Sequence, residues 1–171
     1  MSKSILTSIK IENWPVLDLQ LWQTATNRGD FLEADGKAAH WSNATLLQVQ
    51  KGYSKWLFHL TAESALPAQE LQAPIDRVNK KELRSYLERL NAQGLASQTV
   101  ASRIVDLTEA IRVMQPAADI TILRELSATM QQRATPSRNK HARIKPPKEI
   151  WQACLEYMEQ SIQKYPAPNV N

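Results

Sequence analysis

The sequence predicts an all-α protein: a four-helix bundle with an N-terminal arm, a basic linker and one extra C-terminal amphipathic helix. The chain of 171 residues contains only four glycines. Its apolar residues recur mainly three and four positions apart, which places them on one side of a helix, and the alternation typical of strands is scarce. Hydrophobic residues make up 43% of the chain and charged residues 22%, values typical of a folded domain with its own core.

The N-terminal arm is assigned to residues 1–42. A short helix is expected where three apolar residues share one side: Leu17, Leu21 and Trp22. Glycines and aspartates between 27 and 37 are typical of a loop. Trp14 and Trp41 flank irregular stretches and are expected to pin the arm onto the bundle. The sequence leaves open whether the arm folds independently, wraps the bundle or stays mobile.

The helical domain is assigned to residues 43–133 and begins with two helices. Ser42 is a suitable N-cap for a helix that ends near Ala62 and carries an apolar stripe through Tyr53, Trp56 and Leu60. Asn79 followed by Glu82 resembles a capping box at the start of a second helix, and Gly94 is a natural stop for it. The apolar stripe of that second helix consists of Leu83, Tyr86, Leu87 and Leu90.

Two more helices complete the predicted bundle. Ser97 opens the third, and Pro116 ends it. Its seam repeats every three or four residues: Val100, Ile104, Leu107, Ile111 and Met114. The fourth helix is expected at about 120–132. Arg89 and Arg112 are interpreted as members of local ion pairs or as solvated charges.

A basic linker is assigned to residues 134–148, and an amphipathic helix with a tail to 149–171. The net charge of +4 arises from the last quarter of the chain. Between 126 and 148 there are six basic residues and no acidic one: Arg133, Arg138, Lys140, Arg143, Lys145 and Lys148. Such a segment suits a polyanionic partner, and it is equally typical of a solvated, flexible linker.

The final helix has an apolar stripe of its own: Ile150, Trp151, Leu155, Met158 and Ile162. Trp151, like Trp56, is interpreted as a core residue because it lies within such a stripe. Cys154 is interpreted as a small apolar helix residue rather than a reactive thiol. A single cysteine excludes an intramolecular disulfide, so a cytoplasmic location is expected.

No motif for catalysis, metal binding or cofactor binding is found in the sequence. His40, His59 and His141 are far apart, and no cysteine pair exists to complete a zinc site. His59 is interpreted as a partly buried residue at the end of the first bundle helix. No glycine-rich phosphate loop and no nucleophile elbow occurs. No apolar run reaches 18 residues, and the first residues lack the features of a secretory signal. We therefore expect no cofactor, no metal, no membrane and no small-molecule substrate.

Several segments, in order, resemble the core-binding domain of the tyrosine recombinases, the phage integrase family. Residues 76–90 (DRVNKKELRSYLERL) resemble its second helix, and 96–114 (ASQTVASRIVDLTEAIRVM) its third. Residues 39–60, with a Gly-Tyr-x-x-Trp-Leu run, are similar to its first helix. The stretch 123–126 followed by PSRNKHAR at 136–143 resembles its fourth helix and basic linker. The resemblance covers about 39–160 and implies a SAM-like orthogonal bundle.

The resemblance implies a role in DNA integration and recombination encoded by a mobile element, with double-stranded DNA as the partner. It leaves open whether other recombinase subunits are further partners. In the family, the core-binding and catalytic domains close around the duplex like two halves of a clamp. The expected DNA-binding residues are Lys80, Lys81, Arg84, Ser97, Gln98, Thr99, Arg103, Arg138, Lys140, Arg143 and Lys145. Arginine and lysine there would contact phosphates, and Gln98 or Arg84 would read a base.

The resemblance does not extend to catalysis. The family's catalytic half uses an Arg, a Lys, an HxxR pair, a further His or Trp and a nucleophilic Tyr. None of the three histidines here has an arginine three positions later, and no tyrosine matches the nucleophile. Residues 148–162 resemble only the first helix of that half. We therefore expect a non-enzymatic DNA-binding chain.

A second interpretation is a helical protein-interaction module. The apolar stripe of the final helix, including Trp151, Leu155, Met158 and Ile162, would then pair two chains or dock a partner helix. A third interpretation is an enzyme whose site carries no recognisable motif.

Overall fold

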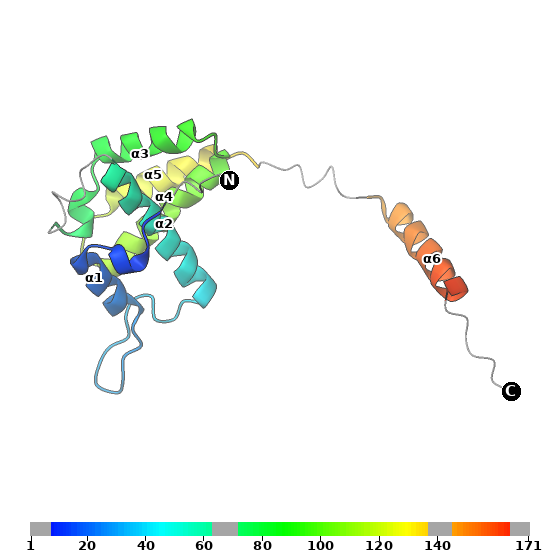
Figure 1. The fold of residues 1–171 in the computed structure, drawn as a ribbon, viewed down its shortest axis with the longest axis horizontal. Helices are drawn as coiled ribbons and strands as arrows, with labels where there is room; N and C mark the ends of the chain where they lie inside the picture. Colours follow the sequence, from blue (N-terminus) through cyan, green and yellow to red (C-terminus); the bar gives the residue numbers. More distant parts are fainter. Residues whose placement is uncertain (1–7, 63–71, 137–144, 165–171) are drawn as a thin grey trace, which may run out of the picture. The chain divides into compact units, whose positions relative to one another are not determined.

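The computed structural model describes residues 8–62, 72–136 and 145–164, and every regular element in these ranges is helical (Figure 1). The six α-helices are α1 (Val16–Thr26), α2 (Asn43–Ala62), α3 (Lys80–Ala92), α4 (Ser97–Met114), α5 (Thr121–Arg133) and α6 (Pro147–Lys164). Two short 3-10 helices are η1 (Ile11–Asn13) and η3 (Pro74–Arg77). The all-α prediction is therefore confirmed. The chain divides into two compact units, Met1–Ser137 and Arg138–Asn171, which are treated separately below.

The predicted helix ends agree with the structure. The Ser42 hydroxyl accepts a hydrogen bond from the Thr45 backbone N–H at 3.2 Å, and α2 ends at Ala62. The Asn79 side chain caps α3 by accepting from the N–H groups of Lys81 and Glu82, both at 3.0 Å. Just beyond α3, Gly94 has a φ of +67°, a left-handed conformation that glycine adopts without strain and that ends many helices.

Helix α4 is the centre of the first unit and contacts α1, α2, α3 and α5. Its predicted seam is buried along its whole length: Val100, Ile104, Leu107, Ile111 and Met114. Gly52 allows α2 to approach α4 closely, because a Cβ atom at Gly52 would lie 2.2 Å from the Cβ of Asp106. The spacing of apolar residues therefore predicted correctly which side of α4 is buried in the core of this unit.

The N-terminal region is part of the same core. The Trp14 indole N–H donates to the Ser54 hydroxyl at 3.0 Å, and the Trp14 ring packs edge-on against Tyr53. Asp18 of α1 is fully buried, forms an ion pair with Arg77 of η3 and accepts a hydrogen bond from the Tyr53 hydroxyl at 2.7 Å. Trp14 and helix α1 of the arm therefore pack onto the bundle, whereas Phe31 and Leu32 in the following loop are exposed.

The second unit contains one described helix, α6, and its apolar stripe is exposed. Trp151 is 68% exposed and Leu155 43%, and Ile150, Met158 and Ile162 are similarly accessible. The interpretation of Trp151 as a core residue is therefore wrong for this fold. Within residues 145–164 no second helix is present against which the stripe packs.

Candidate nucleic-acid interface

The first turn and a half of α3 presents three exposed cations, Lys80, Lys81 and Arg84. Together with Ser85 and Glu88 they line a shallow hollow of about 400 Å³. The Lys81 side chain is 91% exposed, and its ammonium group lies 3.9 Å from the Glu82 carboxylate, a contact that water screens strongly. The backbone N–H groups of Lys81 and Glu82 are already bonded to Asn79. This end of α3 can therefore offer positive side chains to an anion, but few free N–H groups.

The first turn of α4 differs from that of α3, because it offers free backbone N–H groups rather than charged side chains. The residue before it, Ala96, has no side chain that can cap the helix, and no side-chain cap is formed. The Thr99 and Val100 N–H groups bond to the Ala96 carbonyl at 2.8 and 3.1 Å. Gln98 is exposed at this end. An uncapped helix N-terminus carries free N–H groups and a partial positive charge, both of which favour a phosphate oxygen.

Ser97 connects this turn of α4 to the beginning of the basic segment. Its hydroxyl accepts a hydrogen bond from the Thr135 N–H at 3.0 Å and lies 3.2 Å from the Thr135 hydroxyl. Thr135 comes directly after α5, whose last residue, Arg133, is exposed. The structure therefore brings together two of the predicted DNA-binding regions, the start of α4 and the start of the linker.

The structure does not place the predicted DNA-binding residues of the linker beside the start of α4. Arg138, Lys140 and Arg143 lie outside the described residues. Lys145 is exposed and belongs to the second unit, where it borders a hollow on α6.

The predicted cations of α3 lie apart from the start of α4. A helix of 13 residues is about 20 Å long. Lys80 and Lys81 stand at its beginning, whereas the turn at Gly94 that leads into α4 follows its end. The predicted residues therefore form two separate clusters on the first unit. Two clusters about 20 Å apart span roughly six phosphates of one DNA strand, at about 3.4 Å per phosphate.

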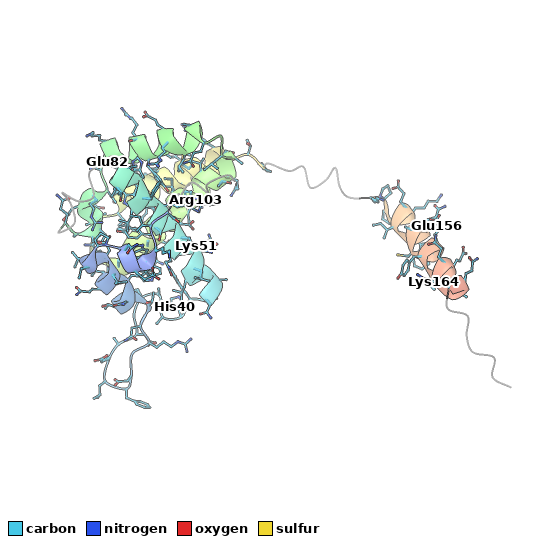
Figure 2. The ribbon with its side chains drawn as sticks, in the orientation of Figure 1. His40, Lys51, Glu82, Arg103, Glu156 and Lys164 are labelled. Atoms are coloured by element: carbon cyan, nitrogen blue, oxygen red, sulfur yellow. The ribbon has the colours of Figure 1, made fainter. Side chains whose placement is uncertain are left out.

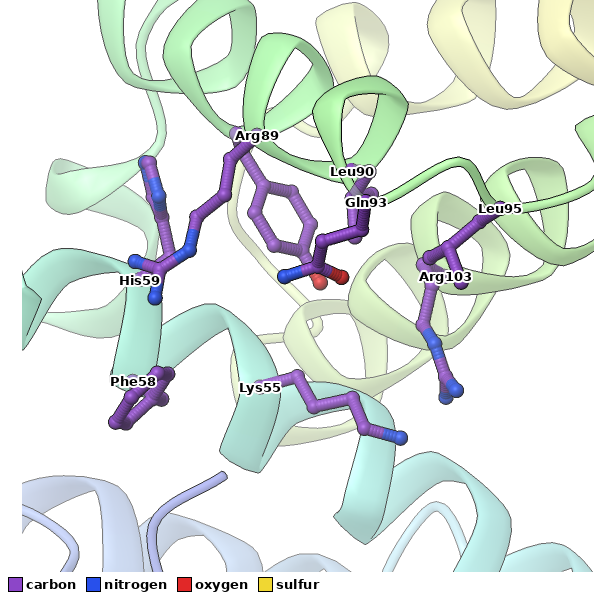
Figure 3. Close-up of a pocket in the computed structure, with 9 residues that line it drawn as sticks. Lys55, Phe58, His59, Arg89, Leu90, Gln93, Leu95 and Arg103 are labelled. Atoms are coloured by element: carbon purple, nitrogen blue, oxygen red, sulfur yellow. The ribbon is translucent and has the colours of Figure 1, made fainter. Parts of the chain in front are cut away.

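Arg103 belongs to neither cluster. It is six residues beyond Ser97, so it faces a different side of α4. There it lines a cavity of about 250 Å³ with Lys55 of α2 and Arg89 of α3 (Figure 3). Its guanidinium lies 4.0 Å from the Asp106 carboxylate, which also accepts a hydrogen bond from the Gln48 amide at 3.0 Å. Figure 2 shows Arg103 on α4 and Lys51 on α2.

Burial and neighbouring charges shift the pKa values around this cavity. Desolvation, Arg103 and Lys51 lower the pKa of the Lys55 ammonium group, and Asp106 opposes them only in part. Burial raises the pKa of Asp106, while its hydrogen bond to Gln48 and the charge of Arg103 act in the other direction. Positive charge is therefore crowded at this point of the surface.

Lys55 and Arg89 were missed as members of a charged site. Arg89 was expected to form a local ion pair or to be solvated. It forms no ion pair with another described residue, and its guanidinium lies 4.9 Å over the Phe58 ring. Arg112 does form one, with Glu109 at 2.6 Å. The only signal in the sequence was the i, i+4 pair of Lys51 and Lys55 on the polar side of α2. That spacing indicates a shared face, but it does not show which helix lies opposite.

On the second unit, α6 has an apolar hollow of about 580 Å³. It is lined by Lys145, Glu149, Ile150, Ala153, Cys154, Tyr157 and Met158. Cys154 is exposed and is not in a disulfide, as expected of a residue on the surface of a helix. The four predicted interaction residues, Trp151, Leu155, Met158 and Ile162, are all exposed.

The described parts of the chain contain no group of three or more His, Cys, Asp or Glu side chains placed to hold a metal ion. None of the described helices is long and apolar enough to cross a membrane. Comparisons with protein-family models, with curated proteins and with solved structures found no match to this chain.

Proposed function

We propose that the chain binds double-stranded DNA as the core-binding half of a tyrosine recombinase and has no cleavage activity of its own. The observation that carries the proposal is the set of hydrogen bonds between Ser97 and Thr135. They hold the uncapped start of α4 beside Thr135, at the beginning of the predicted basic linker. A helix N-terminus favours a phosphate oxygen, and a basic linker that begins beside it can contact neighbouring phosphates.

In this proposal each cluster has its own task. The N–H groups at the start of α4 and the linker residues Lys140, Arg143 and Lys145 contact phosphates, which position the protein but carry no sequence information. Lys80, Lys81 and Arg84 contact the backbone about 20 Å away, at the other end of α3. Gln98, exposed beside the start of α4, is the candidate for reading a base in the major groove.

The absence of cleavage activity is part of the proposal. Tyr53 and Tyr86 are buried in the first unit, and the Tyr53 hydroxyl is bonded to Asp18. The Tyr53 hydroxyl therefore cannot attack a phosphodiester without disrupting the core. Incubation of the chain with nicked and intact duplex, followed by denaturing electrophoresis, tests this point. A covalent protein–DNA adduct or a cut strand would contradict it.

The test of DNA binding is the salt dependence of affinity for a fluorescent random-sequence duplex of about 30 base pairs. A core-binding domain without its catalytic domain should bind weakly, because it contacts fewer phosphates than the two domains together. The logarithm of Kd should change linearly with the logarithm of the salt concentration, by about 0.9 for each phosphate contacted. The variant K140A/R143A/K145A should flatten that slope by up to about 2.7. The same experiment on K80Q/K81Q/R84Q tests the second cluster.

The matched control is K10Q/K37Q/R124Q, which removes the same charge from exposed, described residues outside both clusters. We expect its slope to stay close to that of the unchanged chain. No binding at low salt would overturn the proposal. An equal loss of slope in the control and in the linker variant would mean that net charge alone, and not these clusters, attracts the DNA.

The exposed stripe of α6 favours a second candidate function, a docking site for a protein partner or a second copy of the chain. Its large side chains are between 43% and 68% exposed, which is unusual for one continuous apolar face. Measurement of the molar mass in solution at several concentrations tests self-association. A dimer that is lost in Trp151→Glu would support this candidate, and a monomer at all concentrations would argue against pairing of two chains.

A further inference from the structure

Three helices of the first unit meet around a cavity of about 250 Å³ that carries three cations. Lys55 extends from α2, Arg89 from α3 and Arg103 from α4, as Figure 3 shows. The rest of the wall is formed by Phe58, His59, Tyr86, Leu90, Gln93 and Leu95. A cavity of this size is smaller than the roughly 300–1,000 Å³ of most organic ligand sites, so it suits a small chemical group.

The cations of this cavity are poorly compensated. Among the described residues, neither Lys55 nor Arg89 has a carboxylate within 4.0 Å. The nearby acid is Asp106, which is 4.0 Å from Arg103 and is also bonded to Gln48. Like charges held close together at a partly desolvated surface repel one another, and a bound anion would relieve that repulsion. The lowered pKa of Lys55 has the same origin, in burial and the proximity of Arg103 and Lys51.

A second, independent feature of the cavity is the hydroxyl group of Tyr86. The side chain lines the cavity and is 2% exposed, and its ring packs edge-on against Trp56. The hydroxyl oxygen is buried and has no hydrogen-bond partner among the described residues. Buried hydroxyl groups in folded proteins nearly always have a partner. A ligand oxygen in the cavity would supply one.

We propose that this cavity binds a phosphate group, with Lys55, Arg89 and Arg103 as its charged contacts and the Tyr86 hydroxyl as a hydrogen-bond donor. The site is distinct from the two clusters of the proposed DNA interface and does not depend on that function. The stacking of Arg89 on Phe58 fixes the guanidinium at the cavity while leaving its N–H groups available to an oxyanion. The phosphate can be free or part of a nucleic-acid backbone, and the experiment distinguishes the two.

The first experiment titrates the whole chain with potassium phosphate and, at equal ionic strength, with potassium chloride. Backbone amide NMR shifts or calorimetry report binding. We expect a saturable response to phosphate alone, and affinity about tenfold lower in each of Lys55→Gln and Arg89→Gln, the effect of losing one charged hydrogen bond. Lys37→Gln, an exposed charge outside the cavity and outside both proposed DNA-binding clusters, is the matched control. A response no different from that to chloride, or an equal loss in the control, would overturn the proposal.

The variant Tyr86→Phe distinguishes a role of the hydroxyl group in phosphate binding from a role in the stability of the fold. Because the hydroxyl has no hydrogen-bond partner among the described residues, its removal should leave the free energy of unfolding unchanged or increase it. Phosphate affinity should nevertheless fall several-fold. An unchanged affinity would remove the Tyr86 hydroxyl from the site.

The source of the phosphate is tested by adding inorganic phosphate to the chain with a short duplex, again at constant ionic strength. Competition indicates that the cavity receives a backbone phosphate, whereas simultaneous binding indicates a site for free phosphate. If phosphate saturates the cavity and no duplex binds at any salt concentration, the cavity assignment stands and the proposed DNA-binding function fails. If duplex binds but phosphate alone does not, the cavity assignment fails.

Discussion

Helices α4 and α6 have the same length, 18 residues, and both carry an apolar residue every three or four positions. In α4 that stripe is at most 4% exposed at the five predicted positions, and in α6 it is between 43% and 68% exposed. Two helices with the same spacing of apolar residues thus have a buried stripe in one case and an exposed stripe in the other. Periodicity identifies the face of a helix that can be buried, but the presence of a partner surface decides whether it is buried.

The two helices are therefore stabilised by different interactions. α4 is held by contacts with four other helices, so each side chain of its seam loses packing when it is shortened. α6 has only its internal hydrogen bonds and local propensity within the described part of its unit, and helices of this length are marginal in water without packing. The predictions below test this contrast, starting with the substitution that should affect the packed unit most.

The largest effect is expected for Arg77→Met. Arg77 and Asp18 are both fully buried, and the substitution leaves the Asp18 carboxylate without its cation. Removing one partner of a buried ion pair costs about 3–5 kcal/mol. Urea denaturation should show a loss of this size in the free energy of unfolding of the first unit.

The control for that substitution is Arg112→Met, which breaks the partly exposed pair with Glu109 on the same unit. An exposed pair at i, i+3 contributes about 0.2–0.5 kcal/mol. Equal losses in the two variants would show that the Asp18–Arg77 pair does not tie the N-terminal region to the core.

Leu107→Ala and Leu155→Ala compare the two stripes directly. Leu107 is fully buried in α4, so the cavity left by the substitution should cost about 2–5 kcal/mol. Leu155 is 43% exposed on α6, and its replacement should change stability by less than about 0.5 kcal/mol. A large loss at Leu155 that grows with protein concentration would reveal that α6 is packed against a second chain.

Most of the fold could be predicted because its signals are local. Ser42, Asn79 and Gly94 mark helix ends by hydrogen bonds and backbone geometry within a few residues, and the structure confirms each of them. The apolar face of α4 follows from spacing, and its burial follows from the helices that pack on it. The burial of Asp18 could not be predicted, because its partner Arg77 is 59 positions away in the chain.

The candidate sites were also harder to predict, because residues that lie far apart in the sequence meet in them. The cavity cations come from three different helices, and nothing in the neighbourhood of Arg89 or Arg103 indicates that they meet Lys55. Ser97 was expected to contact DNA, but its hydroxyl is bonded to Thr135, 38 positions away. Local patterns indicated which residues carry charge, and only the packing of the helices determines which charges share a surface.

A smaller effect is expected at the helix starts. Asn79→Ala removes the side chain that caps α3 and should cost about 1 kcal/mol. Ala96→Ser introduces a cap at the start of α4, where none exists, and should stabilise the unit by a similar or smaller amount. Thermal unfolding followed by circular dichroism measures both. If the proposed interface is correct, Ala96→Ser also lowers duplex affinity, because the new hydroxyl occupies an N–H group otherwise available to a phosphate.

The smallest and most specific prediction concerns the pH dependence that Asp106 gives to the packed unit. Burial raises the pKa of Asp106 above its ordinary value of 3.8, so between that value and the folded-state pKa the folded chain binds more protons than the unfolded chain. Stability from this group is therefore present below pH 3.8 and is lost as the pH rises through the folded-state pKa.

Asp106→Asn removes this titration while keeping an oxygen that can accept the hydrogen bond from Gln48. The free energy of unfolding of the variant, minus that of the unchanged chain, should therefore increase as the pH is raised through this window and then level off. Subtraction cancels the titration of the carboxylates that the two chains share. A difference that decreases with pH would mean that Arg103 and Lys55 stabilise the carboxylate more than burial destabilises it. The cavity cations would then already be compensated by Asp106, which would weaken the case for a bound phosphate.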